Sequence, residues 1–437
     1  MAPCLGTLTV PLDRSGVDPG TIDVAYRFVP ARGGRAAQTI AYFQGGPGFA
    51  VVDESIVIEQ FFGPLLDDAN LLMMDYRGVG GSAPLLCPGL GDPTGGLAQR
   101  PSADELAACA ASLAPRGLPH FGTAAAADDF EDLRVALGLG PLDLFGASYG
   151  VFAAEVFAAR HPAAVRSAVL HGGPLATDQR DPWYALRFAA LPSRGLDLAC
   201  ARVDCGNEGV AVSQMWRQAV EAIRRGEIAG LTLADAVLLH RYATGDAGIV
   251  DLALAAIAQV RDGDSAPLVA LAEALRDPPG NEGSADNPSD SRALFLNVFC
   301  NDFPVPFDRA AAPAERRTQF DAAWAALPAD TFDPFTKDEW RSLQTPLASL
   351  CVDWTPRLAL DLPTVPAAIS APLLFVAPEL DATSTEAAFF VGQYPAGQTL
   401  EVALGSHGAA FESACAGDAV RRFLATGTAE PRRCEDD

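Results

Sequence analysis

The chain has 437 residues, of which 49% are apolar and 20% charged, and a formal net charge of −24. This composition supports a large hydrophobic core and argues against a disordered chain. The acidic balance argues against nucleic acid and against anionic membrane surfaces as partners, because both would repel the protein. No apolar run reaches the roughly 18 residues that a spanning helix needs, so we expect no membrane span.

The N-terminus and the cysteines bear on the cellular compartment. The start, MAPCLGTLTVPLD, has no basic or apolar region, so we expect no signal peptide here. The protein is then cytoplasmic, or a leader has been removed and Met1 added. No Cys-x-x-Cys pair occurs among the nine cysteines, which argues against a zinc site. The cysteines are either scattered buried thiols or disulfides between sequence neighbours.

We predict the disulfides, which imply an oxidising compartment and hence a secreted, periplasmic or cell-envelope protein. The predicted pairs leave Cys4 over and are Cys87–Cys109, Cys200–Cys205, Cys300–Cys351 and Cys415–Cys434.

The first third of the chain alternates strand-like and helix-like patterns. Short apolar runs end at glycine-rich turns, as buried parallel strands do, and helical spacing lies between them. The expected strands are 21–28, 39–44, 70–75, 142–145 and 166–170, and the expected helices are 124–137 and 151–160. This alternation predicts an α/β fold with a doubly wound, mostly parallel sheet.

From residue 178 to 365 the pattern is mainly helical, with a helix expected at 268–275 and a polar Gly/Pro loop at 277–290. Strand patterns return at 372–377 and 399–403, before a closing helix at 416–426. We therefore expect an α/β core, residues 1–177 and 366–437, interrupted by a helical cap at 178–365.

A Gly-x-Ser-x-Gly motif, Gly146-Ala147-Ser148-Tyr149-Gly150, lies between an expected strand and an expected helix. In that context the pattern is typical of a nucleophile elbow, where a sharp turn lifts the serine out of the sheet. The alternative is an ordinary turn serine. We interpret Ser148 as the nucleophile of a serine hydrolase.

A serine nucleophile needs a base, and the usual order along such chains is Ser, then Asp or Glu, then His. The chain has five histidines: His120, His161, His171, His240 and His407. His407 follows the last expected strand between small residues, so we predict it as the base. Both Glu379 and Asp381 follow strand 372–377; we predict Asp381 as the acid because it lies deeper in its loop.

The oxyanion hole requires backbone N–H groups aimed at the developing charge. We predict one from Tyr149, which follows the nucleophile, and the others from Gly45 and Gly46 in the loop Gln44-Gly45-Gly46-Pro47-Gly48. The alternative for this loop is a plain tight turn. We also expect Asp75 and Arg77 to pair at a strand end and brace the glycine loop.

Together, GGPG, DYRGVGGS, DLRVALG, GASYG and the late SHG resemble the α/β-hydrolase serine aminopeptidases. These are the prolyl iminopeptidase relatives, and the chain resembles their secreted, tripeptidyl-aminopeptidase-like branch. The resemblance runs from about Leu5 to Cys434. It implies a Ser148–Asp381–His407 triad, an inserted helical cap and a terminal cysteine pair. Two positions depart from the family: Gln44 stands where His is usual, and Asp381-Ala382-Thr383-Ser384 replaces Asp-x-x-Thr-Pro.

The sequence therefore predicts a serine hydrolase that cleaves peptides from a free N-terminus and needs no metal or cofactor. The alternative is an esterase or lactonase, which would share every motif of the core. The expected substrate is a peptide or another small molecule. A non-catalytic binding protein on the same fold would commonly lack a triad residue. We expect a carboxylate of the cap to pair with the substrate's ammonium group, and Asp302 stands out because apolar residues and Cys300 surround it. Its alternative role is structural, capping a helix or bracing a loop.

Overall fold

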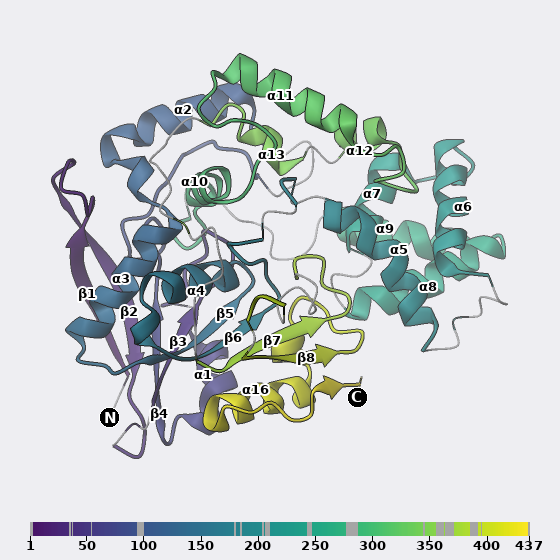
Figure 1. The fold of residues 1–437 in the computed structure, drawn as a ribbon. Coiled ribbons are helices and arrows are strands. Elements are labelled where there is room, and N and C mark those ends of the chain that lie inside the picture. The colour runs from purple at the N-terminus through teal and green to yellow at the C-terminus, as the bar shows by residue number, and fades with distance from the viewer. Residues whose placement is uncertain are drawn as a thin grey trace.

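The computed structural model describes residues 3–34, 36, 38–53, 55–93, 100–178, 181–183, 186–202, 205, 210–242, 247–276, 287–343, 346–354, 362, 371–384, 392–394 and 396–435. A nine-stranded sheet runs through the molecule (Figure 1). Its strands are β1 Cys4–Pro11, β2 Thr21–Val29, β3 Gln38–Phe43, β4 Ala69–Met74, β5 Leu142–Ala147, β6 Val165–His171, β7 Leu373–Pro378, β8 Gly397–Val402 and β9 Arg433–Cys434.

The strand order is β1-β2-β4-β3-β5-β6-β7-β8-β9. β1 and β2 pair antiparallel, β2 also pairs antiparallel with β4, and every later pair is parallel. The carboxyl ends of β3 and β5 to β8 therefore meet at one edge of the sheet, where ligands bind in folds of this kind. The predicted α/β fold class is confirmed.

Helices cover both faces of the sheet. They are α1 Ile56–Phe62, α2 Ala103–Leu113, α3 Thr123–Ala136, α4 Tyr149–Arg160, α15 Ala409–Glu412 and α16 Ala414–Thr426. Successive residues of β3 alternate between two core clusters, as the pleat requires. Ala41 and Phe43 join the cluster that contains α4, whereas Ile40 and Tyr42 join the cluster that contains α1 and α16.

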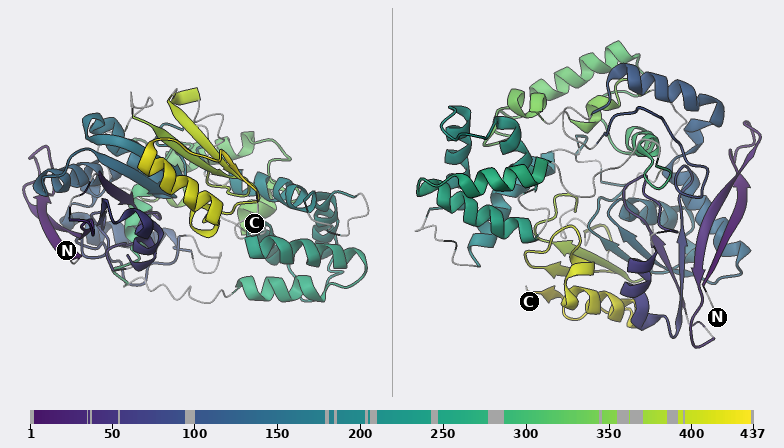
Figure 2. Two further views of the ribbon diagram at one scale, coloured as in Figure 1. Left: turned by 90° about the horizontal axis from the view of Figure 1, so that it is seen from below. Right: turned by 180° about the vertical axis from the view of Figure 1, so that it is seen from behind.

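The elements described between β6 and β7 are helices. They are α5 Leu186–Cys200, α6 Val212–Arg224, α7 Leu233–Tyr242, α8 Ala247–Arg261, α9 Ala266–Arg276, α10 Arg292–Asp302, α11 Pro313–Ala326, α12 Lys337–Leu343 and α13 Leu347–Leu350. Helices α5 to α9 form a lobe beyond the β7–β8 end of the sheet (Figures 1 and 2). The predicted boundary at residue 365 lies outside the described residues, as does most of the predicted loop 277–290.

Helix α10 differs from its neighbours in the insertion. Its apolar residues belong to the core cluster of the sheet and α4, whereas α5 to α9 contribute to a separate cluster. In Figure 1, α10 lies apart from the lobe of α5 to α9. One helix of the inserted region is thus built into the core beside α4.

The predicted disulfides are all present, and Cys4 is free and exposed. Such a set is typical of proteins that fold in an oxidising compartment. Among the described residues, no helix is both long enough and apolar enough to cross a bilayer.

Candidate active site

Ser148 stands on a sharp turn between β5 and α4. Its φ of 57° and ψ of −125° lie in a region that non-glycine residues rarely occupy, and such strain is typical of functional sites. Its N–H donates to the carbonyl oxygen of His171 at 2.9 Å. The turn has the strand–turn–helix geometry that the motif predicts for a nucleophile elbow.

The glycines on either side of Ser148, Gly146 and Gly150, are required because other parts of the backbone lie too close for a side chain. A Cβ on Gly150 would lie 1.9 Å from the carbonyl oxygen of Phe43, and one on Gly146 would lie 2.4 Å from that of Gly150. Gly45 packs directly on Ser148, because its Cβ would lie 3.0 Å from Ser148 Cβ. The glycine loop after β3 therefore sits beside Ser148.

His407 and Asp381 lie together in the loops after β8 and β7. His407 Nδ1 is 3.1 Å from Asp381 Oδ1. The N–H of Thr383 donates to Asp381 Oδ1 at 2.8 Å, and the Ser384 hydroxyl donates to Oδ2 at 2.5 Å. The Thr383 hydroxyl is also 3.0 Å from His407 Nδ1, so it helps to orient the ring. The departure from the family's acid loop thus keeps the carboxylate well supported.

The charges of this pair support each other. Burial alone would raise the pKa of Asp381, but the charge and hydrogen bond of His407, together with hydrogen bonds from Ser384 and Thr383, hold it well below its usual range. Burial lowers the pKa of His407, but the charge and hydrogen bond of Asp381 outweigh this and raise it above 6.5. The side chain of Asp381 is 1% exposed and that of His407 is 41% exposed, so the imidazole can reach a substrate.

The turn after β6 brings the three residues to one place. A Cβ on Gly172 would lie 3.0 Å from Asp381 Oδ2 and 3.5 Å from His407 Nδ1, and one on Gly173 would lie 1.9 Å from the carbonyl oxygen of Ser148. Among the described residues, Ser148 Oγ makes no hydrogen bond to the His407 ring. Such contacts are often long in free enzymes and tighten when substrate binds.

Gln44 changes the prediction for the oxyanion hole. The N–H of Gly45 donates to Gln44 Oε1 at 2.9 Å, and Gln44 Nε2 donates to the carbonyl oxygen of Ala50 at 3.2 Å. Gly45 is therefore already paired, which argues against its predicted role as a donor. For Gly46 and Tyr149, the described part of the chain supplies no acceptor to the N–H group.

The predicted ion pair of Asp75 with Arg77 is wrong. Arg77 pairs with Asp129 in α3, at 2.7 Å for each of two hydrogen bonds. Asp75 instead accepts hydrogen bonds from the N–H groups of Val51, Val52 and Gly81. Asp75 still braces the chain that follows the glycine loop, but it does so through backbone groups.

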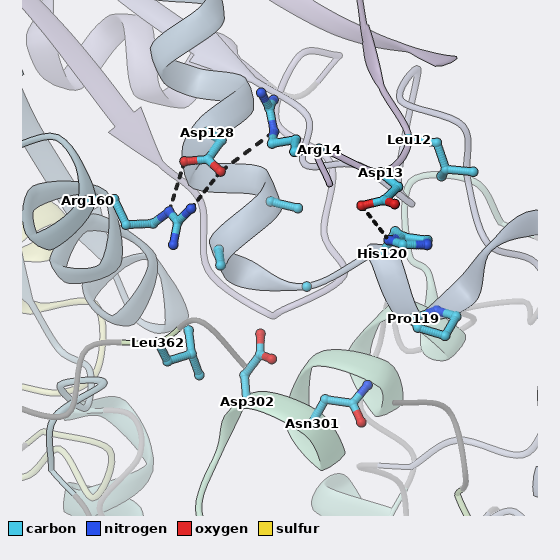
Figure 3. Close-up of a pocket in the computed structure, with 13 residues that line it drawn as sticks. Leu12, Asp13, Arg14, Pro119, His120, Asp128, Arg160, Asn301, Asp302 and Leu362 are labelled. Atoms are coloured by element: carbon cyan, nitrogen blue, oxygen red, sulfur yellow. Dashed lines mark hydrogen bonds and ion pairs between the residues drawn. The ribbon is translucent and has the colours of Figure 1, made fainter. Parts of the chain in front are cut away.

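Asp302, at the end of α10, is 5% exposed. Its Oδ2 accepts hydrogen bonds from the N–H of Thr123 at 2.8 Å and from the Thr123 hydroxyl at 2.5 Å. Thr123 is the first residue of α3, so the carboxylate satisfies a helix N-terminus. Oδ1 accepts no hydrogen bond from the described residues, and the carboxylate faces a cavity of about 160 Å³ (Figure 3). None of the cavity's lining residues is Ser148, Asp381 or His407.

The other histidines are engaged elsewhere. His161 contacts Asp128, and His240 accepts a hydrogen bond from Trp216 in the core of the helical lobe. His171 is 2% exposed, and its Nε2 accepts from the N–H of Ala410, three residues after His407. Burial lowers the pKa of His171 to about 4, so the ring is neutral and supports the loop of the predicted base.

One cluster in the described residues could share a cation: oxygens and nitrogens of Asp13, Asp18 and His120 lie within 4.8 Å of one another. His120 Nε2 is 2.8 Å from Asp18, and Asp13 accepts hydrogen bonds from backbone N–H groups of its own loop. His120 and Asp18 contact each other and Asp13 is held by its own loop, so each of the three side chains already has a partner.

Comparison with known proteins agrees with this geometry. Residues 39–198 match the family described as alpha/beta hydrolase fold, and residues 333–435 match the TAP-like protein family. The fold and the first match show an α/β hydrolase fold. The second match and the relatives below support, more narrowly, a serine hydrolase related to the aminopeptidases.

The chain is 28% identical over 473 aligned residues to a tripeptidyl aminopeptidase of Streptomyces lividans, covering 98% of this chain and 82% of that protein. It is 26% identical over 183 residues to the serine protease Hip1 of Mycobacterium tuberculosis, covering 38% of this chain and 35% of that protein. Among solved structures, proline iminopeptidase of Mycobacterium smegmatis aligns with a TM-score of 0.41 and 16% identity, over 96% of this chain and 98% of that one.

Proposed function

We propose that this protein removes residues or short peptides from the free amino end of peptides, using Ser148, His407 and Asp381 as a triad. The observation that carries the proposal is the 3.1 Å contact between His407 and Asp381, at the sheet edge where the Ser148 elbow also lies. The similarity to a tripeptidyl aminopeptidase over nearly the whole chain supports peptides as the substrate class.

In the proposed reaction Ser148 Oγ attacks the carbonyl carbon of the peptide bond while His407 Nε2 takes the hydroxyl proton. The carbonyl oxygen becomes an oxyanion that the N–H groups of Gly46 and Tyr149 stabilise. The C–N bond breaks as His407 gives its proton to the leaving amine. Water then adds to the acyl-enzyme, again losing a proton to His407, and Ser148 leaves with that proton.

Asp381 acts through His407. It accepts the hydrogen bond of the Nδ1–H group, which leaves Nε2 free to act as the base. Its negative charge stabilises the imidazolium that forms during attack. The raised pKa of His407 is the sign of that stabilisation in the free protein.

An aminopeptidase must also bind the ammonium group of its substrate, which a carboxylate can pair with. Asp302 is the predicted partner, and its unpaired Oδ1 at a cavity is what supports the assignment. Its hydrogen bonds to Thr123 support the structural role at least as well. An exported location is likewise a proposal, supported by the disulfides.

The test is a set of p-nitroanilides and p-nitrophenyl esters, each prepared with a free and with an acetylated amino end. The proposal expects hydrolysis of free-amine anilides and little hydrolysis of their acetylated forms. Ser148→Ala, measured in parallel, controls for contaminating hydrolases. Equal turnover of blocked and free substrates, or turnover of simple esters alone, would replace the aminopeptidase with an esterase.

A further inference from the structure

Helix α10 touches both halves of the proposed oxyanion hole. It comes from the inserted region, yet its residues lie in the core of the sheet and α4, and Ser291, Asn297 and Asp302 along it are all buried. Buried polar groups on one helix need partners, and those partners show what the helix holds in place.

At its start, α10 and the residues before it hold the glycine loop. The N–H of Ser291 donates to the carbonyl oxygen of Gly48 at 2.8 Å, and the N–H of Ala50 donates to the carbonyl oxygen of Ser289 at 2.9 Å. Gly48 has a φ of +107°, and its Cβ would lie 2.7 Å from the carbonyl oxygen of Ser291. The loop that carries Gly46 is thus pinned against the start of α10 by backbone hydrogen bonds.

At its end, α10 holds the residue that supplies the other donor. The Thr123 hydroxyl donates to Asp302 Oδ2, so its oxygen accepts the hydrogen bond from the Tyr149 hydroxyl, with 2.8 Å between the two oxygens. The Tyr149 side chain is buried and packs in the same aromatic group as Phe152 and Phe303. One chain of hydrogen bonds therefore runs from the end of α10 to the residue whose N–H faces the developing charge.

The middle of α10 is fixed as well. Asn297 Nδ2 donates to the carbonyl oxygens of Leu118 and Phe121, just before α3. The Cys300–Cys351 disulfide ties the helix to the end of α13. Because α10 is held at its start, middle and end, it cannot shift along its axis without moving the contacts at both ends. Its position therefore sets the distance between the glycine loop and the turn at Ser148.

We infer that α10 fixes the positions of both donors of the oxyanion hole, the N–H groups of Gly46 and Tyr149. Asp302 and Thr123 are then positioning residues that act through Tyr149. The inference rests on the proposed function, because it assumes that the Gly46 and Tyr149 N–H groups stabilise the oxyanion. It assigns part of the catalytic geometry to a helix of the insertion rather than to the α/β core.

The test uses Thr123→Val, which removes the bridging hydroxyl at nearly constant volume, and Tyr149→Phe, which keeps the backbone N–H. The substrate is p-nitrophenyl acetate, which has no amino group, so recognition of an ammonium plays no part. Loss of a whole oxyanion donor costs about 10²–10³ in kcat, so a displaced donor should cost about 10-fold with KM within about twofold. Thr123→Ser keeps the hydroxyl and should restore kcat.

Ser167→Ala is the matched control. Ser167 Oγ also donates to a buried carboxylate, that of Asp143 at 2.6 Å, but it lies near the start of β6, at the opposite end of that strand from the elbow. This variant should keep the wild-type kcat even if its thermal midpoint falls as far as that of Thr123→Val. Circular dichroism and the fraction of protein labelled by a fluorophosphonate give the amount of folded, competent enzyme in each sample.

Asp302→Ala, which removes the acceptor of the Thr123 hydroxyl, separates the two roles of that residue. If Asp302 positions the oxyanion donors, the variant should have a lower kcat on the ester and on the free-amine anilides alike. A raised KM for free-amine anilides with an unchanged ester kcat would overturn the inference and make Asp302 an ammonium ligand. An unchanged kcat in Thr123→Val and Tyr149→Phe, with Ser148 labelled in the wild type, would overturn the inference alone. A wild type that neither reacts with the fluorophosphonate nor cleaves any substrate would overturn the proposed function with it.

Discussion

The charge of Asp302 should make the stability of the protein depend on pH in a direction opposite to that of most carboxylates. Burial raises the pKa of Asp302 from 3.8 to about 6, although the hydrogen bonds from Thr123 and the charge of Arg309 lower it. The folded state therefore binds a proton more tightly than the unfolded state does. The stabilisation by this proton is complete below about pH 4 and is lost as the pH rises through about 6.

The size of the effect follows from the difference between the two pKa values. At roughly 1.4 kcal/mol per pKa unit, a rise of this size corresponds to about 3 kcal/mol of unfolding free energy. Asp302→Asn removes the titration and keeps an oxygen that can accept from Thr123. The unfolding free energy of the variant minus that of the wild type should therefore rise by about 3 kcal/mol as the pH goes from about 4 to about 7.

The assay is urea unfolding of both proteins at a series of pH values, with the difference between them taken at each pH. Taking the difference cancels every other titrating group that the two proteins share. The reasoning fails if the difference for Asp302→Asn is constant over this pH range, because the carboxylate would then be no more costly to charge in the folded protein than in water.

Three further predictions concern the candidate site and the disulfides. Ser148→Ala should lower kcat by about 10⁴–10⁶ and abolish labelling by a fluorophosphonate, while circular dichroism shows an unchanged fold. Because His407 must be neutral and its pKa is raised, activity should rise with pH with a midpoint above 6.5, and Asp381→Asn should move the midpoint down while costing about 10⁴ in kcat. The double variant Cys300→Ala/Cys351→Ala opens a loop of 51 residues and should cost about 4 kcal/mol in urea unfolding; a loss below about 1 kcal/mol would contradict the loop-entropy estimate.

The sequence was most informative where backbone geometry leaves little choice. The strand before Ser148 and the helix after it follow from apolar runs and a glycine on either side, and the glycines prove to be contact points without room for a Cβ. The disulfides follow from pairing neighbours in order, and the pairs all form. The strand β1, by contrast, was not expected, because Leu5 and other residues of this antiparallel edge are exposed and give no clear apolar pattern.

Side-chain partnerships were harder to predict, because several partners of the right type stand close in the sequence. Glu379 and Asp381 are two residues apart in one loop, yet Glu379 is occupied by Arg202 and Arg433 and by the N–H of Leu404. Only Asp381 faces His407. Gln44 is a similar case: that it caps the N–H of Gly45 depends on a rotamer that no sequence pattern specifies.

Asp302 shows why the role of a buried acid depends on which hydrogen bonds reach it. An acid between apolar residues and beside a disulfide cysteine fits an ammonium ligand and a helix cap equally well, because both roles require a rigid, dry site. The N–H and hydroxyl that bind it belong to Thr123, which lies 179 positions earlier in the chain. That contact exists because α10 packs in the core cluster that also holds α3 and α4, while the Cys300–Cys351 disulfide ties it to the end of α13. The same packing connects the carboxylate through Thr123 to Tyr149, which is why we assign to a residue of the insertion a role in the geometry of the turn that carries Ser148.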